Sequence, residues 1–130
     1  MSLKKYNWMD VWPRFEGKLR EAIEHEVHEF DIEDVVHGLQ QGHLQFWNNE
    51  SAAVVTDIVT LASRNLGIQV VVAGGTYDGV MDLMEDIEQW AREKDFESIL
   101  TIGRVGWNRT PRARQWRHTA SLFVKHLKEH

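Results

Sequence analysis

Residues 67–103 read GIQVVVAGGTYDGVMDLMEDIEQWAREKDFESILTIG, and this stretch decides the fold. It begins with a β-branched apolar run at residues 68–72, typical of a strand that is covered on both faces. Gly74 and Gly75 follow, where the backbone can turn without a Cβ clash. A helix comes next, and residues 98–102 form another strand. This length predicts a right-handed β-α-β crossover between two parallel strands.

The helix of this unit is amphipathic. Its apolar residues share one stripe and are Val80, Leu83, Met84, Ile87, Trp90 and Ala91. Acidic residues occupy most of the opposite side. The pattern predicts a helix that packs one face on the sheet and exposes the other.

Two helices are predicted before the sheet. Asp10 can cap the first helix, which ends near His25. Pro13 is tolerated in its first turn, because the amides of a first turn have no partner within the helix. Asp31 can cap the second, which Gly42 ends.

Period-two patterns predict the remaining strands. Residues 43–47 and 51–60 flank a turn, and a second turn at residues 63–67 leads into the central strand, so an antiparallel meander is expected. A short helix after Thr110 and a closing strand at residues 117–127 complete the chain. The prediction is a single α/β (α+β) domain over residues 1–130, with element order α-α-β-β-β-α-β-α-β and a mixed, mostly antiparallel sheet.

The composition limits the classes of function that this chain can have. The chain has 130 residues, no cysteine and a formal net charge of −5, so disulfides and cysteine-based zinc sites are excluded. No apolar segment approaches the roughly 20 residues of a membrane span, and the start of the chain is not a signal peptide. A cytoplasmic protein that does not bind membranes is expected.

Four short motifs support a family resemblance. They are LQFWN at residues 44–48, AGG at 73–75, IEQWA at 87–91 and GRVGW at 103–107. With the element order, they make the chain similar to the GCN5-related N-acetyltransferase (GNAT) fold without its first strand. More narrowly, the chain resembles small GNAT-like proteins encoded in tailed-phage or prophage genomes. The resemblance covers roughly residues 8 to 127 and implies the fold more than the activity.

The resemblance places a cofactor site after the central strand. In the family, an Arg/Gln-x-x-Gly-x-Gly/Ala loop holds the pyrophosphate of acetyl-CoA on backbone N–H groups at the helix N-terminus. Here residues 73–79 read AGGTYDG, which implies Gly74, Gly75, Thr76 and Gly79 as the contacts if CoA is bound. The initial Arg or Gln is missing, and Asp78 brings a negative charge. The other interpretation is a strand exit followed by a helix N-cap at Thr76 or Asp78.

The catalytic groups of the family are also altered. A glutamate base on the central strand is common, but residues 68–73 contain only Gln69 as a polar residue. The expected tyrosine acid follows the second parallel strand, whereas this chain has only Tyr6 and Tyr77. The sequence therefore predicts no catalytic residue.

An arginine-rich segment is the strongest charge anomaly. Five arginines and no acid lie between Arg104 and Arg117. A surface for a partner or an anion is predicted, and its residues are Arg104, Trp107, Arg109, Arg112 and Arg114. In the other interpretation, the tryptophans close the core and the arginines pair with acidic helices. A protein partner or self-association is expected ahead of nucleic acid.

No metal site is predicted. The histidines of HEVHE at residues 25–29 are three apart, which does not match His-Glu-x-x-His, and no third ligand is evident.

Two function classes follow. The main hypothesis is a phage-related, non-catalytic GNAT-fold protein without a cofactor, acting in interaction or virion assembly in the host cytoplasm or the virion. The alternative is a divergent N-acetyltransferase that depends on acetyl-CoA.

Overall fold

The structure, a computed structural model, describes residues 8–26 and 31–101. Its elements in chain order are a 3-10 turn η1 (Trp8–Asp10), α1 (Trp12–Glu26), α2 (Ile32–Gln40), β1 (Leu44–Asn48), β2 (Ala52–Thr60), β3 (Leu66–Gly75), α3 (Tyr77–Glu93) and β4 (Ile99–Thr101). The predicted order is confirmed as far as β4. The short helix and closing strand predicted after Thr110 lie outside the described residues.

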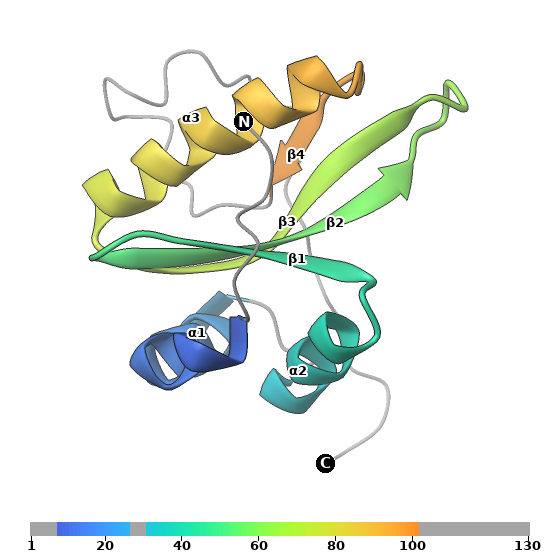
Figure 1. Ribbon diagram of the computed structural model, residues 1–130. Helices are drawn as coiled ribbons and strands as arrows, with labels where there is room; N and C mark the ends of the chain where they lie inside the picture. Colours follow the sequence, from blue (N-terminus) through green and yellow to red (C-terminus); the bar gives the residue numbers. More distant parts are fainter. Residues whose placement is uncertain (1–7, 27–30, 102–130) are drawn as a thin grey trace.

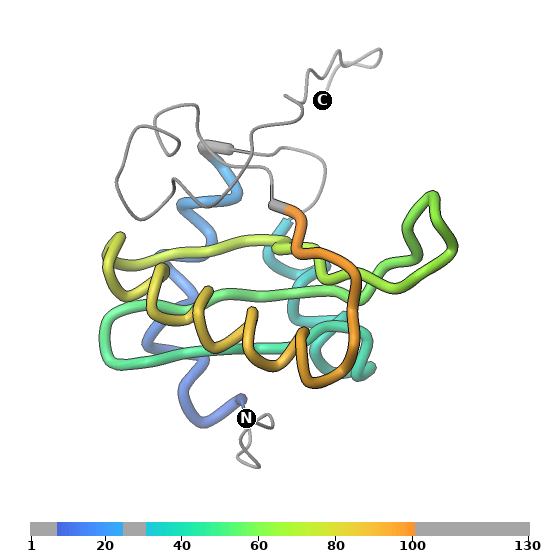
Figure 2. The backbone as a smooth tube through the Cα atoms, turned by 90° about the horizontal axis from the view of Figure 1, so that it is seen from above, coloured from blue at the N-terminus to red at the C-terminus, as the bar shows by residue number. Residues whose placement is uncertain are grey.

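One sheet organises these elements, with strand order β1-β2-β3-β4. The first three strands are antiparallel neighbours, and β4 runs parallel to β3. Helices α1 and α2 cover one face of the sheet and α3 covers the other, as Figure 1 shows. Seen from above, α3 crosses over the strands (Figure 2). The predicted mixed, mostly antiparallel α+β fold is thus confirmed.

Local capping explains where α2 begins and ends. The Asp31 side chain accepts a hydrogen bond from the Asp34 amide, and the Asp34 side chain accepts one from the Asp31 amide, which is a reciprocal capping box. After the helix, Gly42 has a φ of +78°, a conformation that glycine adopts without strain. Both ends of this helix are therefore determined by residues next to it in sequence.

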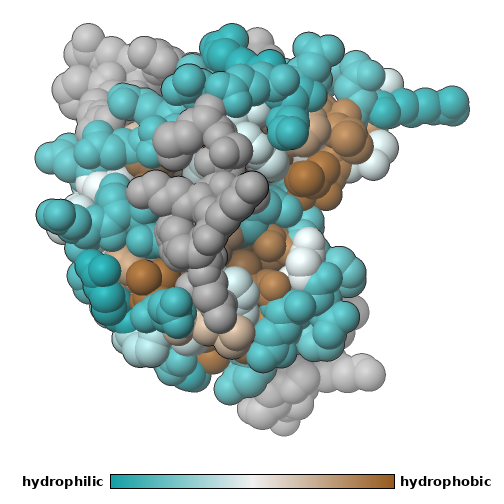
Figure 3. Space-filling view, viewed as in Figure 1, coloured by the Kyte–Doolittle hydropathy of each residue, from teal (hydrophilic) through white to brown (hydrophobic). Residues whose placement is uncertain are grey.

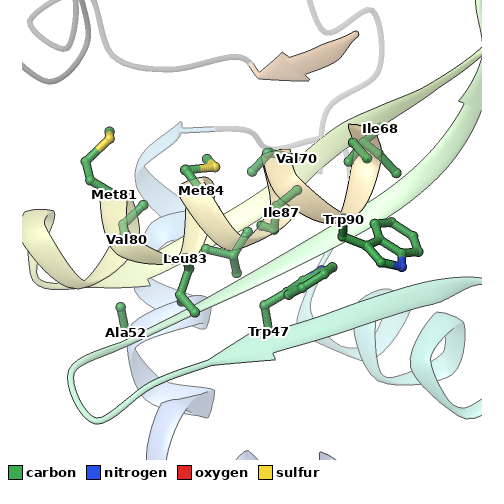
Figure 4. Close-up of a cluster of buried hydrophobic side chains, with 12 residues drawn as sticks. Trp47, Ala52, Ile68, Val70, Val80, Met81, Leu83, Met84, Ile87 and Trp90 are labelled. Atoms are coloured by element: carbon green, nitrogen blue, oxygen red, sulfur yellow. The ribbon is translucent and has the colours of Figure 1, made fainter. Parts of the chain in front are cut away.

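The sheet separates two hydrophobic cores. On the α3 side the core contains the apolar stripe of α3 together with Trp47, Ala52, Val54, Ile68 and Val70. Figure 4 shows α3 lying on the sheet with Trp90 beside Trp47, and the two ring centroids are 5.4 Å apart. On the other side, Phe15 and Leu19 of α1 and Val35 of α2 pack on Val55 and Val72 of the sheet. Burial on both faces of β2 and β3 explains their continuous apolar runs.

The outer end of the β2–β3 hairpin extends past the helices (Figures 1 and 2). Figure 3 shows a mostly hydrophilic face with hydrophobic residues gathered near this end of the sheet. Ile58 and Leu66, which belong to the hairpin, are 40% and 45% exposed. Polar contacts tie the hairpin turn to the segment before β4, because Ser63 Oγ and Asn65 Nδ2 both donate to the Glu97 carboxylate.

A buried hydroxyl joins the first two strands and yields a stability prediction. Thr56 is fully buried; its Oγ1 accepts from Trp47 Nε1 at 3.0 Å and donates to Gln45 Oε1 at 2.9 Å. Thr56→Val removes the acceptor and leaves the indole N–H unpaired. We expect urea denaturation to show a loss of about 2 kcal/mol in the free energy of unfolding. Thr56→Ser, which keeps the hydroxyl, is the control, and equal losses in both variants would contradict the assignment.

Candidate functional site

The candidate site is the junction between β3 and α3. Strand β3 ends at Gly75, Thr76 is the N-cap, and α3 begins at Tyr77, so one residue connects the two elements. The Thr76 side chain accepts a hydrogen bond from the Gly79 amide at 3.1 Å. The Val80 amide donates to the Thr76 carbonyl. The predicted helix N-cap is therefore confirmed at Thr76.

The β1–β2 turn holds this junction in place. Asn49 Nδ2 donates to the Gly79 carbonyl at 2.9 Å, and the Thr76 amide donates to the Ser51 carbonyl at 3.0 Å. The hydroxyls of Thr76 and Ser51 are also 3.0 Å apart. Asn49 Oδ1 accepts from the Ser51 and Ala52 amides, which closes the turn on itself. The first turn of α3 is thus fixed by residues about 25 positions earlier in the chain.

The four predicted cofactor contacts lie together at this junction. Packing within the chain explains why three of them are glycines. A Cβ on Gly79 would overlap the Ser51 hydroxyl, and one on Gly75 would overlap the Ser51 carbonyl. A Cβ on Gly74 would lie 3.0 Å from the Lys18 carbonyl of α1. Gly79 is buried, whereas Gly75 and Thr76 are exposed. The role of all four in binding CoA stays a prediction.

Strand β3 has an irregularity next to this junction. Val55 pairs with Val72 and Thr56 pairs with Val70, so Val71 is the extra residue of a β-bulge. The described parallel pairing with β4 runs from Ile68 to Val70, and its partner Thr101 is the last described residue of β4. Among residues 8–26 and 31–101, the rest of β3 after this point has a strand neighbour on the β2 side alone.

These features fit parts of an acetyl-CoA molecule. The exposed start of α3 places the positive end of a helix dipole where a pyrophosphate would lie. Asp78 lies in the first turn of α3 and is exposed, so its charge opposes such an anion. The cofactor would therefore depend on backbone groups rather than on cationic side chains of the described residues.

Two of the three residues compared with the catalytic groups of the family lie within the described residues. Gln69 is a half-buried residue of β3 and pairs with Asp57 of β2. Tyr77 is half-buried at the start of α3, and Tyr6 lies outside the described residues. The sequence interpretation assigned no role to Asp57. Its charge within an apolar strand was the one signal that pointed to it.

The predicted partner surface cannot be placed. Arg104, Trp107, Arg109, Arg112 and Arg114 all lie outside the described residues. No group of three or more potential metal ligands occurs within the part of the chain that the structure describes. None of the helices in that part is long and apolar enough to cross a membrane.

A separate cavity of about 220 Å³ lies at the opposite end of α3. Its lining mixes charged and apolar side chains, among them Glu88, Arg92 and Phe96. Arg92 forms an exposed ion pair with Glu88. The cavity lies away from Thr76 and the β3 edge, so we place the candidate site at the junction.

Solved structures share this arrangement. A ribosomal-protein-alanine N-acetyltransferase from Brucella melitensis biovar Abortus 2308 superimposes with a TM-score of 0.62 at 12% identity, covering 94% of each chain. The chain has the GNAT acetyltransferase fold. A probable acetyltransferase also gives 0.62, at 9% identity and 94% coverage of each chain. An aminoglycoside acetyltransferase from an uncultured soil metagenomic sample gives 0.58 at 16% identity, covering 99% of this chain and 95% of its own.

Sequence comparisons add no family to this result. No family model matches the chain, and no curated protein matches it. The GNAT fold is therefore established by the three-dimensional arrangement alone.

The main functional hypothesis, a non-catalytic phage protein for interaction or virion assembly, is wrong. Three solved structures that share the fold carry acetyltransferase names, and they favour the alternative of a divergent N-acetyltransferase. The sequence interpretation took the missing Arg or Gln, the charge of Asp78 and the altered catalytic groups as a loss of function. The bulge at Val71 and the N-terminus of α3 are features of the backbone and do not depend on those side chains.

Proposed function

We propose that this chain is a CoA-dependent N-acyltransferase that transfers an acetyl group from acetyl-CoA to a primary amine. In the overall reaction a carbon–sulfur bond breaks, a carbon–nitrogen bond forms, and one proton passes from the amine to the CoA thiolate. When bound, acetyl-CoA supplies the activated acyl group and the thiol leaving group. The fold of known acetyltransferases supports this proposal.

The observation that carries the proposal is the course of β3. A bulge lies at Val71, β3 ends at Gly75, and α3 starts directly after Thr76, with Thr76 and Asp78 exposed. At about 3.3 Å per residue, the strand from Val71 to Gly75 spans roughly 13 Å. The far end of this span meets the helix N-terminus. A pyrophosphate group, as CoA carries, matches that feature.

The first test measures acetyl-CoA binding to the full chain by calorimetry. Asp78→Asn removes a negative charge from the first turn of α3, so we expect acetyl-CoA to bind about three- to tenfold more tightly at low salt. Raising the salt concentration is expected to reduce the difference, since exposed charges are screened.

Asp95→Asn is the matched control. Asp95 is exposed and follows the opposite end of α3, and its φ of +60° is one that asparagine tolerates. The 17-residue helix separates the two acids by about 25 Å. Equal effects of the two substitutions would refute binding at the α3 N-terminus, and no heat at millimolar acetyl-CoA would refute the proposed function.

A further inference from the structure

A carboxylate lies half-buried in the sheet. Asp57 is the only charged residue in the four described strands. Within the described residues, no hydrogen bond or ion pair joins its side chain to a neighbour. Holding a carboxylate partly out of water without a partner is costly, and a bound cation would offset that cost.

Asp57 belongs to a row that crosses the whole described sheet. It pairs with Leu44 of β1 and Gln69 of β3, and Gln69 pairs with Leu100 of β4. Directly opposed residues face the same side with Cβ atoms about 5 Å apart. Because Leu44 packs against the core under α1 and α2, the row faces that side of the sheet. Leu100, at one end of the row, is 41% exposed.

The chemistry of the row matches a primary ammonium on an aliphatic chain. An ammonium group has three donors, and the Asp57 carboxylate and the Gln69 amide oxygen are two acceptors in neighbouring positions. Leu44 and Leu100 at the ends of the row offer apolar contact to the methylene groups.

The charge of the surrounding domain favours the same class of ligand. The full chain has 20 Asp and Glu and 15 Lys and Arg, a formal net charge of −5. A field of this sign raises the local concentration of cations and speeds their association.

We propose that Asp57 and Gln69 bind the ammonium group of the acceptor, and that the acceptor is a cationic aliphatic amine. This inference rests on the proposed function. Gln69 lies two residues before the bulge at Val71, so the bound amine lies within about 7 Å along the strand of the segment that leads to the start of α3.

Calorimetric titration of the full chain with spermidine tests the site. We expect Asp57→Asn to weaken spermidine binding at least fivefold. Asp95→Asn changes the net charge equally at an exposed position outside the sheet, and we expect less than a twofold effect. Parallel titrations with Nα-acetyl-lysine methylamide show whether a polyamine or a protein lysine is the better source of the ammonium.

A second variant separates local contact from charge. Gln69→Leu leaves the net charge unchanged, and we expect it to weaken spermidine binding about threefold because one acceptor is lost. Thermal melting of each variant confirms that it is folded at the titration temperature. Equal weakening by Asp57→Asn and Asp95→Asn, or no spermidine binding at all, would overturn the proposed site.

The acetyl-CoA titration is kept as a separate readout. Spermidine binding that depends on Asp57, without any acetyl-CoA binding, would support the cation site and refute the acyltransferase. Acetyl-CoA binding together with spermidine binding that Asp57→Asn leaves unchanged would support the enzyme and refute the site.

Discussion

Gly75→Ala is expected to lower the free energy of unfolding by about 3 kcal/mol or more. Gly75 has a φ of +119°, which side chains rarely adopt, and an added Cβ would overlap the Ser51 carbonyl and Ala52 Cα. Both are backbone atoms, one in the β1–β2 turn and one at the start of β2, so neither can rotate away. Denaturant unfolding followed by tryptophan fluorescence gives the measurement.

Gly17→Ala is the matched control. Gly17 lies within α1, is exposed, and an added Cβ would meet nothing within 4 Å. Alanine favours the helix, so this variant is expected to gain about 0.5–1 kcal/mol. A Gly75→Ala protein as stable as the wild type would show that β3 leaves the sheet differently. The large expected loss also makes Gly75 a poor probe of cofactor binding, for which Asp78 is preferable.

Trp90→Ala is expected to cost about 3–5 kcal/mol. Trp90 is 6% exposed and packs edge-to-face with Trp47 at 5.4 Å and Phe96 at 5.5 Å. Removing it opens a cavity where α3 and the segment before β4 meet the sheet. The same denaturant measurement applies, with loss of the Trp90 fluorescence allowed for.

Trp8→Ala is the control for this substitution. Trp8 belongs to the 3-10 turn η1 and is only half-buried. Its ring centroid lies 5.5 Å from that of Trp12, at the margin of the core that α1 and α2 cover. We expect a loss of about 1 kcal/mol, because less surface leaves water. Losses of equal size would contradict a central role for the cluster of Trp47, Trp90 and Phe96.

Much of the fold could be predicted from neighbouring residues. The apolar stripe of α3 recurs with the helical period, and Asp31 and Thr76 cap helices through residues three positions away. The alternation in β2 and the turns around it likewise predict a meander. These signals are local, so the chain displays them before it folds.

The site could be predicted only in part. The AGGTYDG stretch correctly marked the junction of β3 and α3. It did not show that Gly79 is small because the Ser51 hydroxyl occupies the space beside it. The missing Arg or Gln was also read as a loss of function, whereas solved structures that share the fold carry acetyltransferase names.

The sequence by itself determined the helices, the strands and their order, because periodicity, caps and turns are encoded within a few residues. The tertiary structure alone decided the bulge at Val71, the contact of Asn49 with α3 and the row that joins Asp57 to Gln69. Each of these depends on the register between strands or on contacts between distant segments. Register is set by the packing of both sheet faces at once, and no short stretch of sequence contains that information.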